Sequence, residues 1–322
     1  MRRRDLLAGL LATTTASAVR AQQSSSRVWR VAFFYPGTLG DPEREVWGAF
    51  VSELRSRGYI EGKNLLLDLR DAKGLLERIP AIMDELIALR PDVIVAIGNP
   101  VVAAAQHATA TIPIVMWSVI DPVGNGYVSS LARPGGNSTG TTAMSDVSIS
   151  KAVELLHLLV PAAHRVAVLL SGPSQQRFLA SARKAAEAMG LNVVPISAPA
   201  PADLDQAFAE IAAKECEAIF VPMSPHNGPA IPLLAAKSKL PAVYQLRNLV
   251  EDGGLASYGE DHLQIARRSA YLVDRIFKGT RPSDLPVEEP VTFVLAVNLK
   301  AAATLGLTIP DAIIARADRV IE

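Results

Sequence analysis

The stretch RVAFF, residues 30–34, returns as RVAVL at residues 165–169, 135 residues later. Each is a short apolar run, which predicts a buried strand. Two further pairs keep a similar spacing: DVIVAIGNP from Asp92 is matched by EAIFVPMSP from Glu217, and TIPIV around Pro113 is matched by KLPAV around Pro241. Recurrence of the same order at spacings near 130 residues predicts two structurally equivalent lobes.

Within each half, strand-like runs alternate with helical stretches. In the first half, predicted strands at 30–34, 65–69, 92–97 and 112–117 are separated by predicted helices at 43–57, 75–89 and 101–107. Such βαβα alternation predicts an α/β fold with parallel sheets, here two Rossmann-like lobes joined by a multi-strand hinge. A late helix at 263–277 is expected to return to the first lobe. We assign residues 28–142 plus 257–285 to the N-terminal lobe and 143–256 plus 286–322 to the C-terminal lobe.

The first residues are of a different kind. Arg2, Arg3 and Arg4 precede an apolar run of small residues at 6–19, and Val19-Arg20-Ala21 has the small residues of a cleavage site. This pattern predicts a signal peptide over residues 1–21, removed before Gln22, and the apolar run is shorter than the roughly 20 residues of a membrane span. The arginine pair also resembles a twin-arginine signal. We therefore expect a soluble periplasmic protein without a direct membrane anchor.

The sequence GGNSTG at residues 135–140 contains G-x-S-x-G, the frame of a nucleophilic serine in many hydrolases. A nucleophile elbow requires a strand before the serine and a helix after it. Ser138 instead follows a Pro-Gly-Gly turn and precedes a β-prone run, which predicts a turn feeding a hinge strand. An exported hydrolase with a cleft serine stays as the alternative function. A repressor-like regulator would need a basic helix-turn-helix where this chain has its signal peptide.

The stretch DPVGNGYVSSLARPGGNSTGTT, residues 121–142, resembles the DPVGxGxVxSLxRPGGNxTG signature of a family of ABC transporter solute-binding proteins, the tryptophan-binding-protein-like group. Similar stretches are RPDVIVAIGNPVVAAAQHAT, IPIVMWSVIDP, LPAVY, EDGGLASYGED and LPVEEPVTFVLAVNLKAAATLGLTIP, so the resemblance covers essentially the whole mature chain. It implies a periplasmic binding protein of type I, not an enzyme, which captures a small solute by hinge closure and delivers it to an inner-membrane permease.

Ligands of open α/β sheets bind outside the carboxyl ends of the strands. In a two-lobed protein both sets of strand ends face one cleft, so the residues after each predicted strand are candidate ligand contacts. From the first lobe these are Tyr35, Gly37, Thr38, Asn99, Pro100, Trp117, Ser118 and Asp121, and from the second Gly172, Ser174, Ser224, His226, Tyr244 and Gln245.

Two features of these candidates bear on the ligand. Asn99-Pro100 reads as a helix N-cap followed by proline, a start that suits a carboxylate, although Asn99 could serve as a cap alone. Tyr35, Trp117 and Tyr244 could sandwich a flat ligand between the lobes, or could pack the lobe cores. Together they predict a small, partly apolar or aromatic carboxylate such as an amino acid. The family's usual Asn-Pro-Asp loop is replaced by Ser171-Gly172-Pro173, so the family's ligand does not carry over directly.

Other classes of function lack support in the composition. The 32 basic and 32 acidic residues balance, which predicts no nucleic-acid partner. The histidines have no paired spacing and Cys216 is the one cysteine, so neither a metal site nor a disulfide is expected. No phosphate-binding or dinucleotide fingerprint is present, and no cofactor is expected. We expect a monomer.

Overall fold

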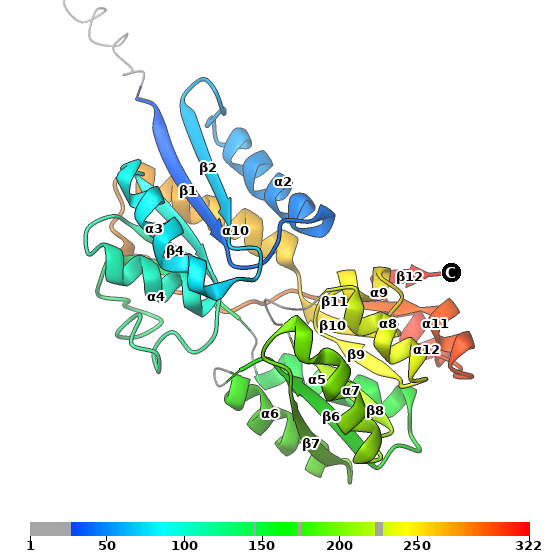
Figure 1. The fold of residues 1–322 in the computed structure, drawn as a ribbon. Coiled ribbons are helices and arrows are strands. Elements are labelled where there is room, and N and C mark those ends of the chain that lie inside the picture. The colour runs from blue at the N-terminus through cyan, green and yellow to red at the C-terminus, as the bar shows by residue number, and fades with distance from the viewer. Residues whose placement is uncertain (1–26, 144–145, 173–174, 223–227) are drawn as a thin grey trace, which may run out of the picture.

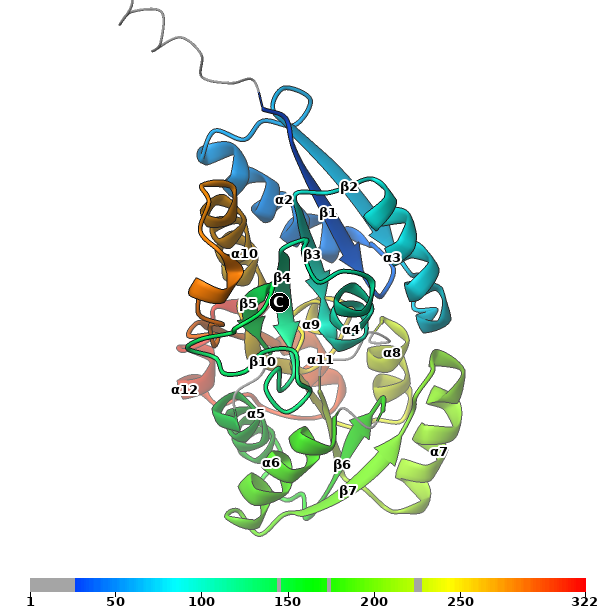
Figure 2. The same ribbon diagram turned by 90° about the vertical axis from the view of Figure 1, so that its left-hand side faces the viewer.

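The computed structural model describes residues 27–322 apart from residues 144–145, 173–174 and 223–227. It contains two α/β lobes, one above the other in Figures 1 and 2. The predicted signal peptide and the candidate contacts Ser174, Ser224 and His226 lie outside the described residues. Within the described part, no helix has both the length and the apolar character needed to cross a membrane.

The first lobe is built on a five-stranded parallel sheet in the order β2-β1-β3-β4-β5. Its apolar strands are buried because helices cover both faces. Helices α2 and α10 pack on one face, and α3 and α4 on the other. The strands are β1 (Trp29–Tyr35), β2 (Leu65–Asp71), β3 (Val93–Ile97), β4 (Ile114–Val119) and β5 (Ser138–Thr142). The helices are α2 (Asp41–Ser56), α3 (Ile79–Ala88), α4 (Gly98–Ala108) and α10 (His262–Phe277).

The second lobe has a seven-stranded sheet in the order β12-β11-β10-β9-β8-β6-β7, in which only the β10–β11 pairing is antiparallel. Helices α5, α6, α11 and α12 cover one face, and α7, α8 and α9 cover the other. The strands are β6 (Arg165–Leu170), β7 (Asn192–Ser197), β8 (Ala218–Val221), β9 (Ala242–Tyr244), β10 (Ala256–Glu260), β11 (Phe293–Asn298) and β12 (Arg319–Ile321). The helices are α5 (Asp146–Leu159), α6 (Gln176–Glu187), α7 (Leu204–Ala213), α8 (Ala230–Lys237), α9 (Asn248–Glu251), α11 (Leu299–Thr304) and α12 (Asp311–Ile314).

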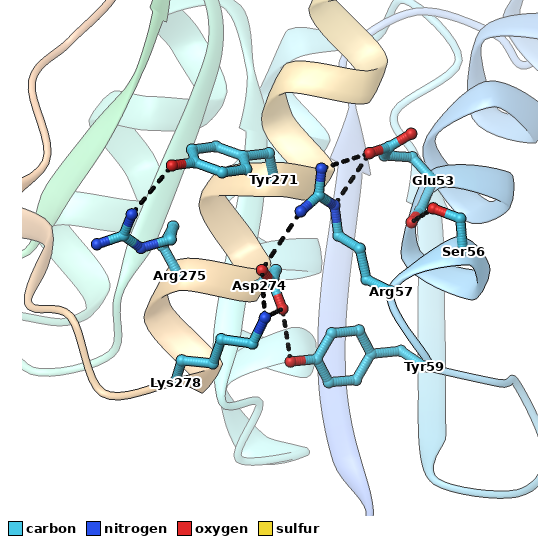
Figure 3. Close-up of polar contacts among 8 residues, drawn as sticks. All are labelled: Glu53, Ser56, Arg57, Tyr59, Tyr271, Asp274, Arg275 and Lys278. Carbon is cyan, nitrogen blue, oxygen red and sulfur yellow. Dashed lines mark hydrogen bonds and ion pairs between the residues drawn. The ribbon is translucent and has the colours of Figure 1, made fainter.

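Helix α10 comes from late in the chain and is held against α2 by a buried carboxylate (Figure 3). The side chain of Asp274 is 2% exposed and lies 2.8 Å from Lys278 Nζ, and it accepts a hydrogen bond of 2.9 Å from Tyr59 Oη. Arg57, paired with Glu53 at 2.6 Å, also reaches Asp274 at 3.5 Å. Burial and the bond to Asp274 raise the pKa of Tyr59 to about 12. These contacts attach the late helix to the first lobe.

Three segments connect the lobes, namely those from β5 to α5, from β10 to α10, and residues 286–292 before β11. Backbone hydrogen bonds tie them together: the Thr142 amide donates to Glu288 O at 2.9 Å, and the Asp261 amide donates to Thr292 O at 3.0 Å. The predicted lobe boundary at residue 257 falls inside β10, which pairs with β9 and β11 in the second sheet. The chain therefore crosses back to the first lobe after Glu260.

Ser138 begins β5 and is 1% exposed. Its Oγ accepts a hydrogen bond of 2.8 Å from Gln106 Nε2. The backbone passes from the strand into the inter-lobe connection, whereas a nucleophile elbow would pass into a helix with the serine exposed. Ser138 thus has a packing role in the edge strand next to β4, and the hydrolase alternative loses its candidate nucleophile.

Candidate functional site

A cavity of about 260 Å³ lies between the two lobes. Residues of the first lobe that line it come from the carboxyl ends of β1, β3 and β4 and from α2, and residues of the second lobe come from the ends of β6, β9 and β10. This is the position expected for a ligand in a parallel α/β sheet, because the loops there leave a crevice beyond the strand ends.

The first lobe supplies an aromatic wall to this cavity. Phe33, Tyr35, Trp47 and Trp117 all line it. The Phe33 ring lies 4.6 Å from the Trp47 ring and 5.6 Å from the Trp117 ring, centroid to centroid, both in edge-on arrangements. Trp117 is 2% exposed, while Trp47, on α2, is half-buried. Such a cluster offers both ring faces and ring edges to a flat apolar group.

Ser118 is the polar group that the first lobe presents beside this wall. It is 4% exposed and lines the cavity, and its Oγ has no hydrogen-bond partner within the described residues. Its backbone has φ 50°, an uncommon conformation for a residue other than glycine. A buried hydroxyl without a partner costs free energy, and backbone strain of this kind concentrates at ligand sites. Ser118 therefore stays a candidate ligand contact.

The start of α4 also opens onto the cavity, through Gly98, Asn99 and Pro100. The helix begins at Gly98, so Asn99 lies in its first turn and is not the predicted N-cap. Its amide is used elsewhere: Nδ2 donates to Ile120 O and Oδ1 accepts from the Ile120 amide, both at 2.9 Å. Asn99 thus fixes the loop after β4, while the positive end of the helix faces the cavity.

The second lobe contributes mainly charged and polar groups, from β10 and the β9–α9 turn. Glu260 is 6% exposed and lines the cavity together with Arg247 and Asn248. Asp261, which also lines it, follows Glu260 where the chain crosses to the first lobe. Asp261 Oδ1 caps α10 by accepting the amides of Leu263 at 3.0 Å and Gln264 at 3.2 Å. A carboxylate that lines a cavity can form a charge-assisted hydrogen bond with a cationic group of a ligand.

His262, the first residue of α10, also lines the cavity. Burial lowers its pKa to about 4; neighbouring Asp261 opposes this shift and Arg247 adds to it. The imidazole is therefore neutral in the folded protein near neutral pH.

We expect this histidine to make the protein less stable in mild acid. Between the ordinary pKa of 6.5 and the folded value of about 4, the unfolded chain binds a proton that the folded protein does not bind. The free energy of unfolding should fall as the pH decreases through this window. His262→Gln should make the fall in melting temperature from pH 7 to pH 5 shallower, with His107→Gln on the exposed side of α4 as the control. An unchanged slope in His262→Gln would contradict this assignment.

The structure brings together only some of the residues predicted from strand ends. Tyr35, Asn99, Pro100, Trp117 and Ser118 line the cavity. Five others are not in the lining, namely Gly37, Thr38, Asp121, Gly172 and Gln245. Gly37 packs against the Tyr35 ring, and Asp121 Oδ1 accepts the Gly124 amide at 3.0 Å. Gly172 is next to Ser171, which does line the cavity.

Tyr244 differs most from its predicted role. Its side chain is fully buried in the core beneath α7, α8 and α9, and Gly254 packs against its ring. Alternate residues of a strand face opposite sides of the sheet, and Tyr244 shares the side of Ala242. The structure therefore gives the core-packing alternative for this ring, and the aromatic side chains of the described lining all come from the first lobe.

Sequence reasoning missed Trp47, Arg247, Glu260 and His262, which all line the cavity. His262 is the first residue of α10, so a search of helix N-termini at the same sheet edge would have found it. Trp47 lies in the second turn of α2, and Glu260 lies in a stretch that was assigned to the first lobe from residue 257 onward. Within the described residues, no group of three His, Cys, Asp or Glu side chains is placed to hold a metal ion.

Comparisons with known proteins agree with this architecture. The tyrosine-binding protein of Clostridioides difficile (strain R20291) is 29% identical over 243 residues, which cover 74% of this chain and 70% of the relative. A conserved domain protein of Vibrio cholerae O1 biovar El Tor has a crystal structure that is 30% identical, with a TM-score of 0.85 over 91% of this chain and 100% of its own. An ABC domain from Streptococcus pneumonia in complex with L-Trp is 25% identical, with a TM-score of 0.85 over the same shares of the two chains.

The fold is that of periplasmic binding proteins of type I, as predicted. Of the relatives, one is named for tyrosine binding and another was solved with L-Trp bound, which describes substrate-binding proteins rather than enzymes. The model of the ABC transporter substrate binding protein family matches residues 40–321. The match spans both lobes and all three connections between them, and the chain therefore belongs to the family of ABC transporter substrate binding proteins.

Proposed function

We propose that this protein captures an aromatic L-amino acid between its lobes and delivers it to the permease of an ABC importer. The observation that carries the proposal is the division of the cavity, with aromatic rings on the side of the first lobe and charged groups on the side of the second. Relatives that bind tyrosine and tryptophan support the same ligand class. Export by residues 1–21 belongs to the proposal and rests on the sequence alone.

The polar groups suit the two charges of an α-amino acid. The ammonium group would lie near Glu260 and Asp261, whose carboxylates are at the end of β10 and the start of α10. The carboxylate would lie at the start of α4, where it would accept a hydrogen bond from Ser118 Oγ and gain from the helix dipole. The side chain would then contact Phe33, Trp47 and Trp117.

Closure of the lobes around the ligand is part of the proposal. The aromatic groups belong to the first lobe and Glu260 belongs to the second, so full contact with both requires the lobes to approach each other. The connections between the lobes are short segments that can act as a hinge, as in other two-lobed binding proteins.

The test is calorimetric titration and thermal shift with L-tryptophan, L-tyrosine and L-phenylalanine. At a hundred times its dissociation constant, a ligand should stabilise the protein by about 2.7 kcal/mol. Tryptamine, which lacks the carboxylate, and indole-3-propionate, which lacks the ammonium group, should each bind far more weakly than tryptophan. Binding of sugars or metal ions alone would contradict the ligand class. Equal binding of tryptamine and tryptophan would contradict the carboxylate site, and a small-angle scattering profile unchanged by ligand would contradict closure.

A further inference from the structure

Arg247 connects the two lobes at the wall of the cavity. It precedes α9 in the second lobe, and its Nη2 lies 2.7 Å from Glu45 Oε2 on α2 of the first lobe. Its Nε also lies 3.4 Å from Glu251 Oε1, within the second lobe. One guanidinium therefore contacts one carboxylate across the cleft and another on its own side.

The two pairings respond differently to opening of the cleft. The Arg247 backbone is built into the second lobe, because its carbonyl accepts the Val250 amide at 2.9 Å. When the lobes separate, the distance from Arg247 to Glu45 must increase, whereas Glu251 moves with Arg247. Glu45 also directly precedes Val46 and Trp47, which line the cavity, so the pair joins the aromatic wall to the polar wall.

We propose that Arg247 is a positioning residue for closure, whose ion pair with Glu45 holds the lobes together around the ligand and slows ligand release. This rests on the proposed function, since it concerns the same cavity. The Arg247 and Glu45 side chains are 34% and 54% exposed, so water and salt screen the pair. Exposed pairs of this kind change equilibria modestly, and we expect about a threefold effect on release.

The experiment compares Glu45→Gln with Glu251→Gln, each of which removes one carboxylate beside the same arginine. Release of L-tryptophan or L-tyrosine is followed by stopped-flow displacement in 50 mM and 500 mM sodium chloride. Glu45→Gln should release ligand about threefold faster at low salt, and the difference from the unmodified protein should shrink at high salt. Glu251→Gln should release at the unmodified rate. Equal effects of the two variants, or no effect of Glu45→Gln, would overturn the proposal.

A second measurement needs no ligand. Spin labels on the two lobes report the inter-lobe distance distribution in the unliganded protein. Glu45→Gln should shift the distribution toward longer distances and Glu251→Gln should not. If no aromatic amino acid binds the unmodified protein, the proposed function fails while this distance shift still supports the ion pair as a closing contact. If the amino acids bind but Glu45→Gln leaves both release and distance unchanged, only the role of Arg247 fails.

Discussion

Replacing Gly140 by alanine is expected to lower the stability of the protein more than any other single change considered for this chain. Gly140 lies in β5 beside β4 with φ +142°, a conformation that L side chains rarely adopt. A Cβ atom there would overlap the carbonyl oxygen of Met116 and lie 2.6 Å from its amide nitrogen. Both atoms belong to the backbone of a fully buried strand, which cannot move aside without breaking the sheet.

We expect Gly140→Ala to lower the free energy of unfolding by about 3 kcal/mol or more, because the added Cβ overlaps the backbone and the positive φ strains an alanine. At roughly 2–4 °C per kcal/mol, the melting temperature should fall by at least about 6 °C. Gly136→Ala is the matched control, because no heavy atom lies within 4 Å of the Cβ that it would add. We expect Gly136→Ala to change the free energy of unfolding by no more than about 0.5 kcal/mol. If the two variants have the same melting temperature, the close approach of β5 to Met116 is not a constraint on the fold.

Replacing Trp47 by alanine is expected to produce the largest loss of ligand affinity. Trp47 is half-buried on α2, and its ring contacts Phe33 at 4.6 Å and Phe50 at 5.6 Å between centroids. Its remaining surface faces the cavity. Loss of the ring from an aromatic contact of this size should cost about 2–3 kcal/mol of binding free energy, or roughly 30- to 150-fold in dissociation constant.

Trp29→Ala is the control for the same substitution outside the cavity. The Trp29 ring stacks on Phe277 at 4.2 Å, on the side of the first lobe where α10 ends. Its removal should lower the melting temperature without changing affinity. Calorimetry with L-phenylalanine measures the affinity of both variants. Because this ligand has no indole, the protein's own tryptophan fluorescence can be followed as a second signal. An unchanged affinity in Trp47→Ala would remove the aromatic wall from the proposed site.

The two-lobed architecture could be predicted from the sequence because its signal is local and repeated. In a strand such as RVAFF, every position after Arg30 is apolar, which is the pattern of a parallel strand covered on both faces, and the same pattern returns in the second half. The return of α10 to the first lobe was also predicted, from its place between two loops. The lobe boundary was predicted at residue 257, inside β10, because the partners of this strand, β9 and β11, are chosen by pairing across the sheet and leave no mark in its own five residues.

The site shows the same division between local and long-range information. Ser118 and Trp117 could be predicted because each follows or ends an apolar strand, and strand ends meet at one edge of a parallel sheet. The side of the sheet that a side chain faces depends on how its strand is placed in the sheet. Tyr244 therefore lies in the core although it too ends a strand. Arg247 meets Glu45 across 202 residues of sequence. The sequence alone determined the order of strands and helices. Tertiary packing decided how the two lobes meet, and so brought Glu260 and Arg247 of the second lobe to the same cavity as the aromatic rings of the first.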